Sequence, residues 1–315
     1  MNTKVSGARR QFLTSVAKLG PLAVLGSAGN GSALAGADAS EPHSRTLRIR
    51  GARLHYLEWG SRRSPCMLLL HPAPFNARMW RSFAPLMAHR YHVVAPDFRG
   101  FGESDWSDHY DSELFVGDLR ALITRLRLAK PVICGNSLGG TAAYLYAGTY
   151  PSEVSRLIVM DVAPPQDAGA ANGSANAAPP PRPVPIPEGP FKSAEAAAAM
   201  IPPFLGEAFA REMIEQNLRR MPDGSFDWIF DRAGTLQSFP RSVNDPRKWP
   251  AWNAITCPTL VLRGERSPAV AQDWAEHIVQ GRANFELAVI PGAGHFIALD
   301  APQAFAATVK DWLSR

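Results

Sequence analysis

The sequence predicts an α/β fold, with a mostly parallel open sheet, helices on both faces and an inserted helical cap. Short apolar runs alternate with helical patterns over most of the chain, which is typical of parallel sheets with crossover helices. Residues 162–249 break this alternation, because they contain no clear strand. With 315 residues, 46% of them hydrophobic, the chain is long enough to bury a full core.

The expected core is built by residues 40–161 and 250–315. Two alternating segments within residues 45–59 predict two strands, and six later strands are expected at 66–72, 91–97, 131–136, 156–161, 258–264 and 286–292. Helical patterns follow several of these runs, at 112–129, 138–150, 269–281 and 301–313. This order of strand and helix predicts an open sheet with crossover connections.

Residues 162–249 are predicted to form the cap, over one end of the sheet. The insertion begins with an Ala-, Gly- and Pro-rich stretch at 168–189, which is typical of a flexible or polyproline-like linker. Helical patterns follow at 193–205 and 206–221, and then a turn and an aromatic, strand-like piece. Eight apolar side chains either line a pocket or form the cap's own core: Met200, Ile201, Phe204, Leu205, Phe209, Met213, Trp228 and Phe230.

Residues 1–39 resemble a twin-arginine export signal. The pair Arg9-Arg10 is followed by a weakly apolar segment and by small-residue sites at 33–35 and 37–39. Cleavage is therefore expected after about residue 35 or 39, with a periplasmic or secreted mature protein and the twin-arginine machinery as the precursor's partner. An ordinary amphipathic helix is the alternative, but the glycines and serines of the Gly, Ser and Ala run disfavour a helix.

The basic character of the chain is mostly a property of this segment. Cleavage after Ala35 removes Lys4, Arg9, Arg10 and Lys18, so that Lys+Arg falls from 33 to 29 against 28 acidic residues. A net charge of +5 becomes +1, which makes a nucleic-acid partner improbable, and no basic stripe with interleaved aromatics is present. No long apolar run follows residue 40, so a stable membrane span is not expected.

Three cysteines, Cys66, Cys134 and Cys257, lie in or beside strand-like runs. Their odd number leaves at least one unpaired, and none belongs to a C-x-x-C or His-rich cluster. Buried free thiols are therefore expected, with no metal site and no cofactor.

Ser137 is the candidate nucleophile. The stretch Gly135-Asn136-Ser137-Leu138-Gly139 matches G-x-S-x-G between an apolar run and a helical pattern, which is the strand-turn-helix context of a nucleophile elbow. The glycines are expected because a Cβ there would crowd the serine. A serine hydroxyl needs a base, and His295 follows the last predicted strand, where a loop would carry it over Ser137.

Four stretches together resemble an α/β-hydrolase fold enzyme of the serine esterase and lactonase type: "LLLHPAPFNARMW", "APDFRGFGESD", "CGNSLGG" and "VIPGAGHFIALDAP". The resemblance covers roughly residues 45–315 apart from the cap, and it is specific to the superfamily rather than to a substrate. It implies structural roles for Asp97, Arg99, Gly100 and Gly102. Serine at the nucleophile position argues against a haloalkane dehalogenase or an epoxide hydrolase, which use aspartate there.

The resemblance also implies an oxyanion hole. Its two donors would be the backbone N–H of Leu138, after the nucleophile, and that of Ala73 in the loop after the third strand. The family usually has glycine where this chain has Pro72, which lacks an N–H. The donor that is needed lies on Ala73 and is therefore kept, but the sequence does not determine the conformation of the loop.

The acid of a triad is the least determined member. The family usually carries it after the strand at 258–264, but Ser267 stands at that position. Glu265 directly follows the strand glycine, where it is expected to point elsewhere, and Asp273 is expected to start a helix. The preferred candidate is Asp161, after the strand at 156–161, which keeps the order Ser, acid, His. The alternative is that Asp161 only anchors the entry to the cap.

These residues predict an exported serine hydrolase that cleaves a carboxylic ester or lactone through an acyl-serine intermediate. Two alternatives stay open at this point. The same fold serves C–C bond hydrolases and cofactor-free perhydrolases, and a domain of this kind can also be a non-catalytic ligand-binding module.

Overall fold

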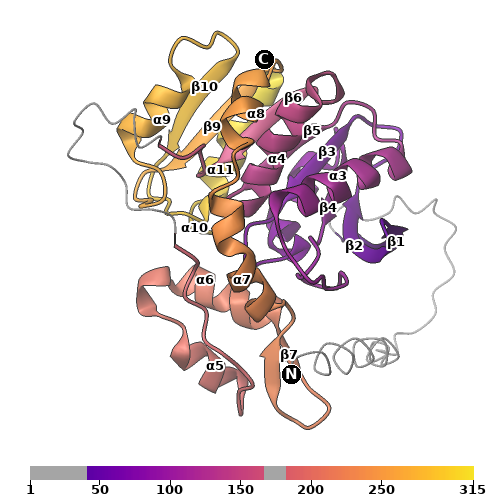
Figure 1. Ribbon diagram of the computed structural model, residues 1–315, viewed down its shortest axis with the longest axis vertical. Helices are drawn as coiled ribbons and strands as arrows, with labels where there is room; N and C mark the ends of the chain where they lie inside the picture. The colour runs from indigo at the N-terminus through magenta and orange to yellow at the C-terminus, as the bar shows by residue number, and fades with distance from the viewer. Residues whose placement is uncertain (1–40, 167–181) are drawn as a thin grey trace, which may run out of the picture. The chain divides into compact units, whose positions relative to one another are not determined.

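The computed structural model describes residues 41–166 and 182–315, so the predicted export signal and most of the Ala- and Gly-rich stretch lie outside the described residues. The core is an eight-stranded sheet with the order β1-β2-β4-β3-β5-β6-β9-β10 (Figure 1). Its strands are β1 (His43–Ile49), β2 (Ala52–Trp59), β3 (Cys66–Leu70), β4 (His92–Pro96), β5 (Val132–Asn136), β6 (Arg156–Met160), β9 (Thr259–Gly264) and β10 (Phe285–Ile290).

The sheet is mostly parallel, as the sequence predicts. Only the pairings β1 with β2 and β2 with β4 are antiparallel, and the pairings from β4 to β10 are parallel. β3, β4 and β5 are buried at every residue, because helices cover both of their faces. The predicted fold class is confirmed.

Two groups of helices cover the sheet. On one side α3 (Ser112–Leu126) and α8 (Lys248–Ala254) contact α4 (Leu138–Thr149), which lies on β5 and β6. The other group comprises η1 (Ala77–Ser82), α2 (Ala84–Met87) and α11 (Pro302–Ser314), joined by the rings of Phe83 and Phe305 at a centroid distance of 4.5 Å. The remaining core helices are α9 (Gln272–Val279), α10 (Ile297–Asp300) and η2 (Pro151–Glu153).

The three cysteines are free and buried, as expected. In the described ranges, no helix is long and apolar enough to cross a bilayer.

The insertion between β6 and β9 has its elements from α5 to α7 below the sheet in Figure 1. It contains α5 (Ala194–Met200), η3 (Pro203–Leu205), α6 (Glu207–Glu212), the π-helical turn η4 (Met213–Asn217) and α7 (Arg232–Val243). It also contains a small hairpin, β7 (Leu218–Arg220) with β8 (Phe226–Trp228). The helix expected over 206–221 therefore ends early, because its last residues pair with β8 instead of continuing the helix.

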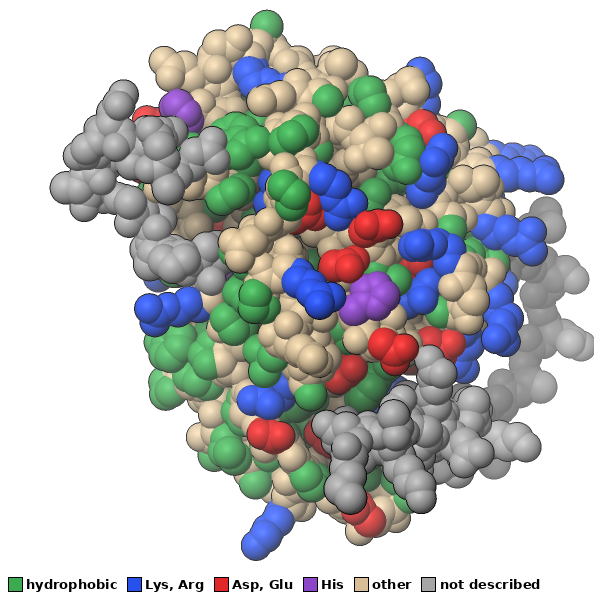
Figure 2. Space-filling view, in the orientation of Figure 1, with side chains coloured by type: hydrophobic (Ala, Val, Ile, Leu, Met, Phe, Trp, Pro, Cys, Tyr) green, Lys and Arg blue, Asp and Glu red, His purple; other side chains and the backbone are tan. Residues whose placement is uncertain are grey.

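The eight apolar cap residues separate into two sets. Five of them are buried: Ile201, Phe209, Met213, Trp228 and Phe230. Trp228 packs within the cap, on Phe191 and Phe230, whereas the ring of Phe209 packs on Phe75 and Phe296 outside it. In contrast, Met200 and Phe204 are 55% and 77% exposed. Figure 2 shows hydrophobic side chains on the surface in the region where Figure 1 places α5 and α6. Met200 and Phe204 therefore do not line an enclosed pocket.

Glu212, at the end of α6, gives the cap a predictable pH dependence. Its Oε1 is buried and has no hydrogen-bond partner among residues 41–166 and 182–315. Burial, with Glu215 nearby, raises its pKa from 4.5 to about 7 against the opposing charges of Arg211 and Arg81. The folded state thus holds the proton more tightly than the unfolded chain, so stability falls as the pH rises from about 4.5 to 7. In the wild type this costs up to roughly 3 kcal/mol of the free energy of unfolding, and we expect Glu212→Gln, which cannot ionise, to abolish that loss.

Urea unfolding at pH 5 and pH 8 measures this effect as a difference between variants. Glu207→Gln, at an exposed glutamate in the first turn of α6, is the matched control and should follow the wild type. An equal loss of stability in the wild type and in Glu212→Gln between the two pH values would contradict the assignment.

Candidate active site

Ser137 lies at the sharp turn between β5 and α4. Its backbone has φ 53° and ψ −113°, a conformation that serine rarely adopts. The turn is held because the Ser137 N–H donates to Met160 O on β6 (3.1 Å) and Ser137 O accepts from the Thr141 N–H (2.8 Å). The half-buried side chain therefore leaves the sheet at the carboxyl end of β5, which is the geometry of a nucleophile elbow.

Two glycines allow the close backbone approaches at this turn. A Cβ on Gly135 would lie 2.3 Å from Gly139 O, and a Cβ on Gly139 would lie 2.2 Å from Leu70 O at the end of β3. Both distances are shorter than a Cβ tolerates. The crowding therefore lies at the neighbouring backbone and not at the serine, where the sequence pattern predicts it.

The loop after β10 brings His295 to Asp161, the first residue after β6. His295 Nδ1 lies 2.7 Å from Asp161 Oδ2, and the side chains are 22% and 0% exposed. An ionised carboxylate only accepts hydrogen bonds, so a neutral imidazole in this position carries its proton on Nδ1 and keeps its lone pair on Nε2. Within the described ranges neither Nε2 nor Ser137 Oγ has a hydrogen-bond partner, and such bonds often tighten only when substrate binds.

Three further hydrogen bonds fix Asp161. Its N–H donates to Leu262 O (2.7 Å), its Oδ1 accepts from the Gly264 N–H (3.1 Å), and its Oδ2 accepts from the Ser267 hydroxyl. These partners all belong to β9 or the loop that follows it. The carboxylate is therefore tied to the neighbouring strand, with its remaining side turned to His295.

The other two carboxylates considered from the sequence do not reach the histidine. Glu265 is exposed, and its Oε2 accepts from the Gly292 N–H (2.8 Å). Asp273 is exposed in the first turn of α9. Among these candidates the structure brings only Asp161 to His295, and Ser267, which stands where the family usually has its acid, lies against the same carboxylate.

Two backbone N–H groups face no protein acceptor. Leu138 is the first residue of α4, and Ala73 lies in the loop after β3; among the described residues, the N–H of neither donates a hydrogen bond. Pro72 is accommodated through its carbonyl, which accepts from the Phe75 N–H (2.9 Å) and from His71 Nδ1 (3.0 Å). Unused N–H groups beside a nucleophile elbow are what an oxyanion hole requires.

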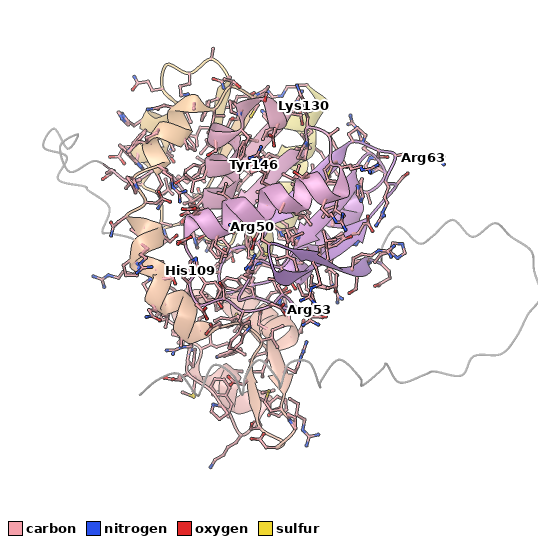
Figure 3. The ribbon with its side chains drawn as sticks, turned by 45° about the vertical axis from the view of Figure 1, so that its right-hand side comes forward. Arg50, Arg53, Arg63, His109, Lys130 and Tyr146 are labelled. Carbon is pink, nitrogen blue, oxygen red and sulfur yellow. The ribbon has the colours of Figure 1, made fainter. Side chains whose placement is uncertain are left out.

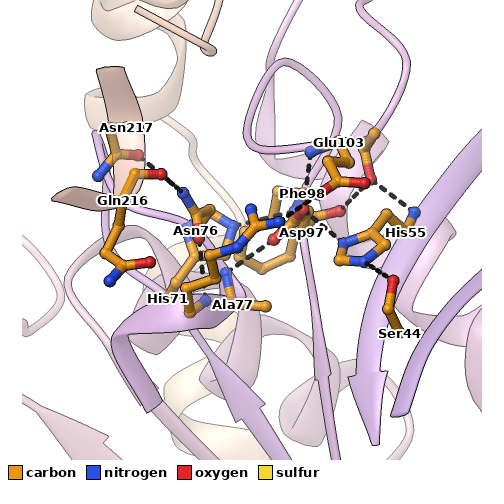
Figure 4. A network of polar contacts seen from close by, with 12 residues as sticks. Ser44, His55, His71, Asn76, Ala77, Asp97, Phe98, Glu103, Gln216 and Asn217 are labelled. Atoms are coloured by element: carbon orange, nitrogen blue, oxygen red, sulfur yellow. Dashed lines mark hydrogen bonds and ion pairs between the residues drawn. The ribbon is translucent and has the colours of Figure 1, made fainter. Parts of the chain in front are cut away.

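A buried network positions the loop that carries Ala73 (Figure 4). Asp97 Oδ1 accepts from the Ala77 N–H (2.7 Å) and Oδ2 from His55 Nδ1 (2.7 Å). Burial alone would raise the pKa of Asp97, but the hydrogen bonds from His55 and Ala77 outweigh it and lower the pKa. Burial lowers the pKa of His71, whose Nε2 accepts from the Phe98 N–H (3.0 Å), so this histidine is neutral.

Other residues of the "DFRGFGES" stretch pack against neighbouring parts of the core. Arg99 forms a two-pronged ion pair with the buried Asp118 of α3, at 2.7 and 2.8 Å. Arg50, labelled in Figure 3, also reaches Asp118 at 3.3 Å. A Cβ on Gly102, whose φ is +55°, would lie 2.1 Å from Asp97 Oδ2. These contacts fit the structural roles that the resemblance implies.

Asn136 is a site residue that the sequence analysis did not single out. Its buried Nδ2 donates to Met160 O (2.9 Å) and to His295 O (3.2 Å), so it joins the strand before Ser137 to the histidine loop. The signal was present in the sequence, since an amide directly precedes the candidate nucleophile at the end of an apolar run. A buried amide at that point needs partners, and the backbone carbonyl of His295 supplies one.

Comparison with known proteins identifies the class to which this fold and site belong. Residues 67–308 match the model of the alpha/beta hydrolase family. Because this match covers most of the chain, the protein belongs to the alpha/beta hydrolase family.

Individual relatives are distant but similar over most of their length. Epoxide hydrolase 3 of Xenopus tropicalis is 27% identical over 305 residues, covering 85% of this chain and 76% of that protein. The sn-1-specific diacylglycerol lipase of Mus musculus is 29% identical over 255 residues, covering 79% and 81%. The crystal structure of E-2-(acetamidomethylene)succinate hydrolase superposes with a TM-score of 0.74 at 23% identity, covering 87% of this chain and 100% of that one, which shows the shared fold.

Proposed function

We propose that this α/β hydrolase is a serine hydrolase that cleaves a carboxylic ester or lactone through an acyl-serine intermediate. The observation that carries the proposal is the Asp161–His295 pair, joined through Asn136 to the turn that presents Ser137. A serine hydroxyl becomes a nucleophile when a base accepts its proton, and a carboxylate on Nδ1 leaves Nε2 of the histidine free for that purpose.

The proposed reaction has two halves. Ser137 Oγ attacks the carbonyl carbon and its proton passes to His295 Nε2, while the oxyanion accepts from the N–H groups of Leu138 and Ala73. The bond to the leaving oxygen then breaks, and that oxygen takes the proton from His295. In the second half water attacks the acyl-serine in the same way, which releases the acid and restores Ser137.

Serine at position 137 favours this chemistry over epoxide opening, although epoxide hydrolases are among the relatives. The lipase among the relatives has a name that denotes cleavage of an ester, which is consistent with the proposal for this chain.

A substrate panel combined with mass spectrometry tests the proposal. The wild-type protein is offered chromogenic short-chain esters, lactones, β-diketones and an epoxide, and acid-quenched samples are digested to look for an acyl group on the Ser137 peptide. We expect turnover of an ester or lactone together with that adduct.

Other outcomes point to the competing functions. Turnover of diketones alone would indicate a C–C bond hydrolase, and peroxide-dependent turnover of a carboxylic acid would indicate a perhydrolase. No turnover and no labelling of Ser137 by a fluorophosphonate would indicate a binding module.

We also propose that the precursor is exported by the twin-arginine machinery, on the strength of Arg9-Arg10 and the small-residue sites that follow. Replacing both arginines with lysine keeps the charge but removes the paired motif, so we expect the precursor to accumulate in the cytoplasm. Cell fractionation with an antibody measures this. As a control, Lys4→Arg and Lys18→Arg should leave export unchanged, and undiminished export of the Lys-Lys variant would contradict the proposal.

A further inference from the structure

Three aromatic rings from distant parts of the chain meet beside the candidate site. Phe75 lies two residues after Ala73, Phe209 is in the cap helix α6, and Phe296 directly follows His295. The ring centroids are 5.2 Å apart for Phe75 and Phe209, 5.2 Å for Phe75 and Phe296, and 5.0 Å for Phe209 and Phe296. All three rings are buried, and each contacts both of the others.

A second link joins the cap to the same loop. Asn76 Nδ2 donates to Gln216 O and to Asn217 Oδ1, both at 2.9 Å, in the π-helical turn η4 that follows α6 (Figure 4). Asn76 also caps η1, because its Oδ1 accepts from the Arg78 N–H (2.9 Å). The cap segment 207–217 therefore contacts the oxyanion loop twice, through one ring pair and one side-chain amide.

The histidine side of the cluster is equally direct. The rings of Phe296 and His295 are 4.9 Å apart, and α10, which begins at Ile297, contacts α6. Phe209 therefore touches the residue that follows the base as well as a residue close to the oxyanion donor. A displacement of about 1 Å of such groups reduces the rate of a positioned reaction by about 10²-fold.

We infer that Phe209 is a positioning residue: through Phe75 and Phe296 it fixes the oxyanion loop and the histidine loop relative to each other. The inference rests on the proposed function, and it makes docking of the cap helix a condition for the alignment of Ala73 and His295. A cap that only covered the substrate would instead affect how tightly the substrate binds.

The experiment compares Phe209→Ala with Phe191→Ala. Phe191 is a matched control, since it is 4% exposed and its ring packs edge-on against Trp228 inside the cap at 5.1 Å. On the ester turned over by the wild type, we expect Phe209→Ala to lower kcat about 10²-fold with KM nearly unchanged, and Phe209→Leu to recover most of that loss. Phe191→Ala should lower the melting temperature but keep kcat.

Two kinetic results would overturn the inference. One is an equal loss of kcat in Phe191→Ala, which would mean that only the integrity of the cap matters. The other is a rise in KM at unchanged kcat in Phe209→Ala, which would make Phe209 a wall of the substrate site. If the alanine variants do not fold, Phe209→Val and Phe191→Val, which also remove the ring and shorten the side chain, are compared in the same way.

A readout without substrate separates this inference from the proposed function. The Nδ1 proton of His295, bonded to Asp161, gives a low-field proton resonance, which is identified by its loss in His295→Gln. We expect this resonance to shift or broaden in Phe209→Ala and to stay in place in Phe191→Ala. An unchanged resonance in Phe209→Ala would overturn the inference, whereas a wild type that hydrolyses no ester would refute the proposed function and leave this test valid.

Discussion

Ser137→Ala is expected to lower kcat for the best ester by 10⁵-fold to 10⁶-fold, which is the order of loss on removing the nucleophile of a serine hydrolase. Serine and alanine both carry a Cβ, so the strain of the backbone at φ 53° is the same in the variant and the melting temperature should change little. The loss comes from chemistry alone, because no other atom at this turn can form the acyl intermediate. Initial rates at saturating ester and fluorophosphonate labelling measure the two consequences.

The control for Ser137→Ala is Ser155→Ala, an exposed serine beyond the end of α4. This variant should hydrolyse the ester and label like the wild type. Undiminished turnover by Ser137→Ala would show that the reaction does not pass through this serine, and the acyl-serine proposal would be abandoned.

Asp161→Asn is expected to lower kcat by about 10⁴-fold with little change in stability. The asparagine Oδ1 can still accept from the Gly264 N–H, but its NH₂ group then faces His295 Nδ1. Facing a donor, the imidazole adopts the tautomer in which Nδ1 accepts the hydrogen bond and Nε2 carries the proton. His295 would then be unable to accept the proton of Ser137.

Glu265→Gln and Asp273→Asn are the matched controls, since both carboxylates are exposed and neither bonds to His295. Both should keep wild-type rates. A collapse of either control with Asp161→Asn still active would move the acid to that residue. Full activity of all three variants would mean that His295 works as the base of a dyad.

The core could be predicted from the sequence because its strands are short, apolar and separated by helical patterns. All eight strands of the sheet fall within or next to the expected runs. The cap was harder, because its elements depend on distant contacts. Asn217 ends a π-helical turn where its side chain accepts from Asn76, which lies 141 positions away. α7 carries Pro240 in its interior, so its pattern does not read as a helix.

The site shows the same limit. Ser137 and His295 stand in local patterns, and those patterns are visible in the sequence. The contacts of Asn136 with His295 and of Ser267 with Asp161 join strand ends that are 159 and 106 positions apart. Only the order of strands in the sheet brings such residues together, so residue types alone did not indicate these partners.

The meeting of positions 161 and 267 has a consequence for how hydrolases are surveyed across genomes. The two residues follow the adjacent strands β6 and β9, and their side chains meet beside the imidazole of His295, which bonds to Asp161. Two carboxylates there would repel each other, so with Asp161 as the proposed acid the other position is free to supply a small donor such as serine. A search pattern that demands aspartate at position 267 would discard this chain as a degenerate enzyme, whereas a search for one carboxylate at that shared point would retain it.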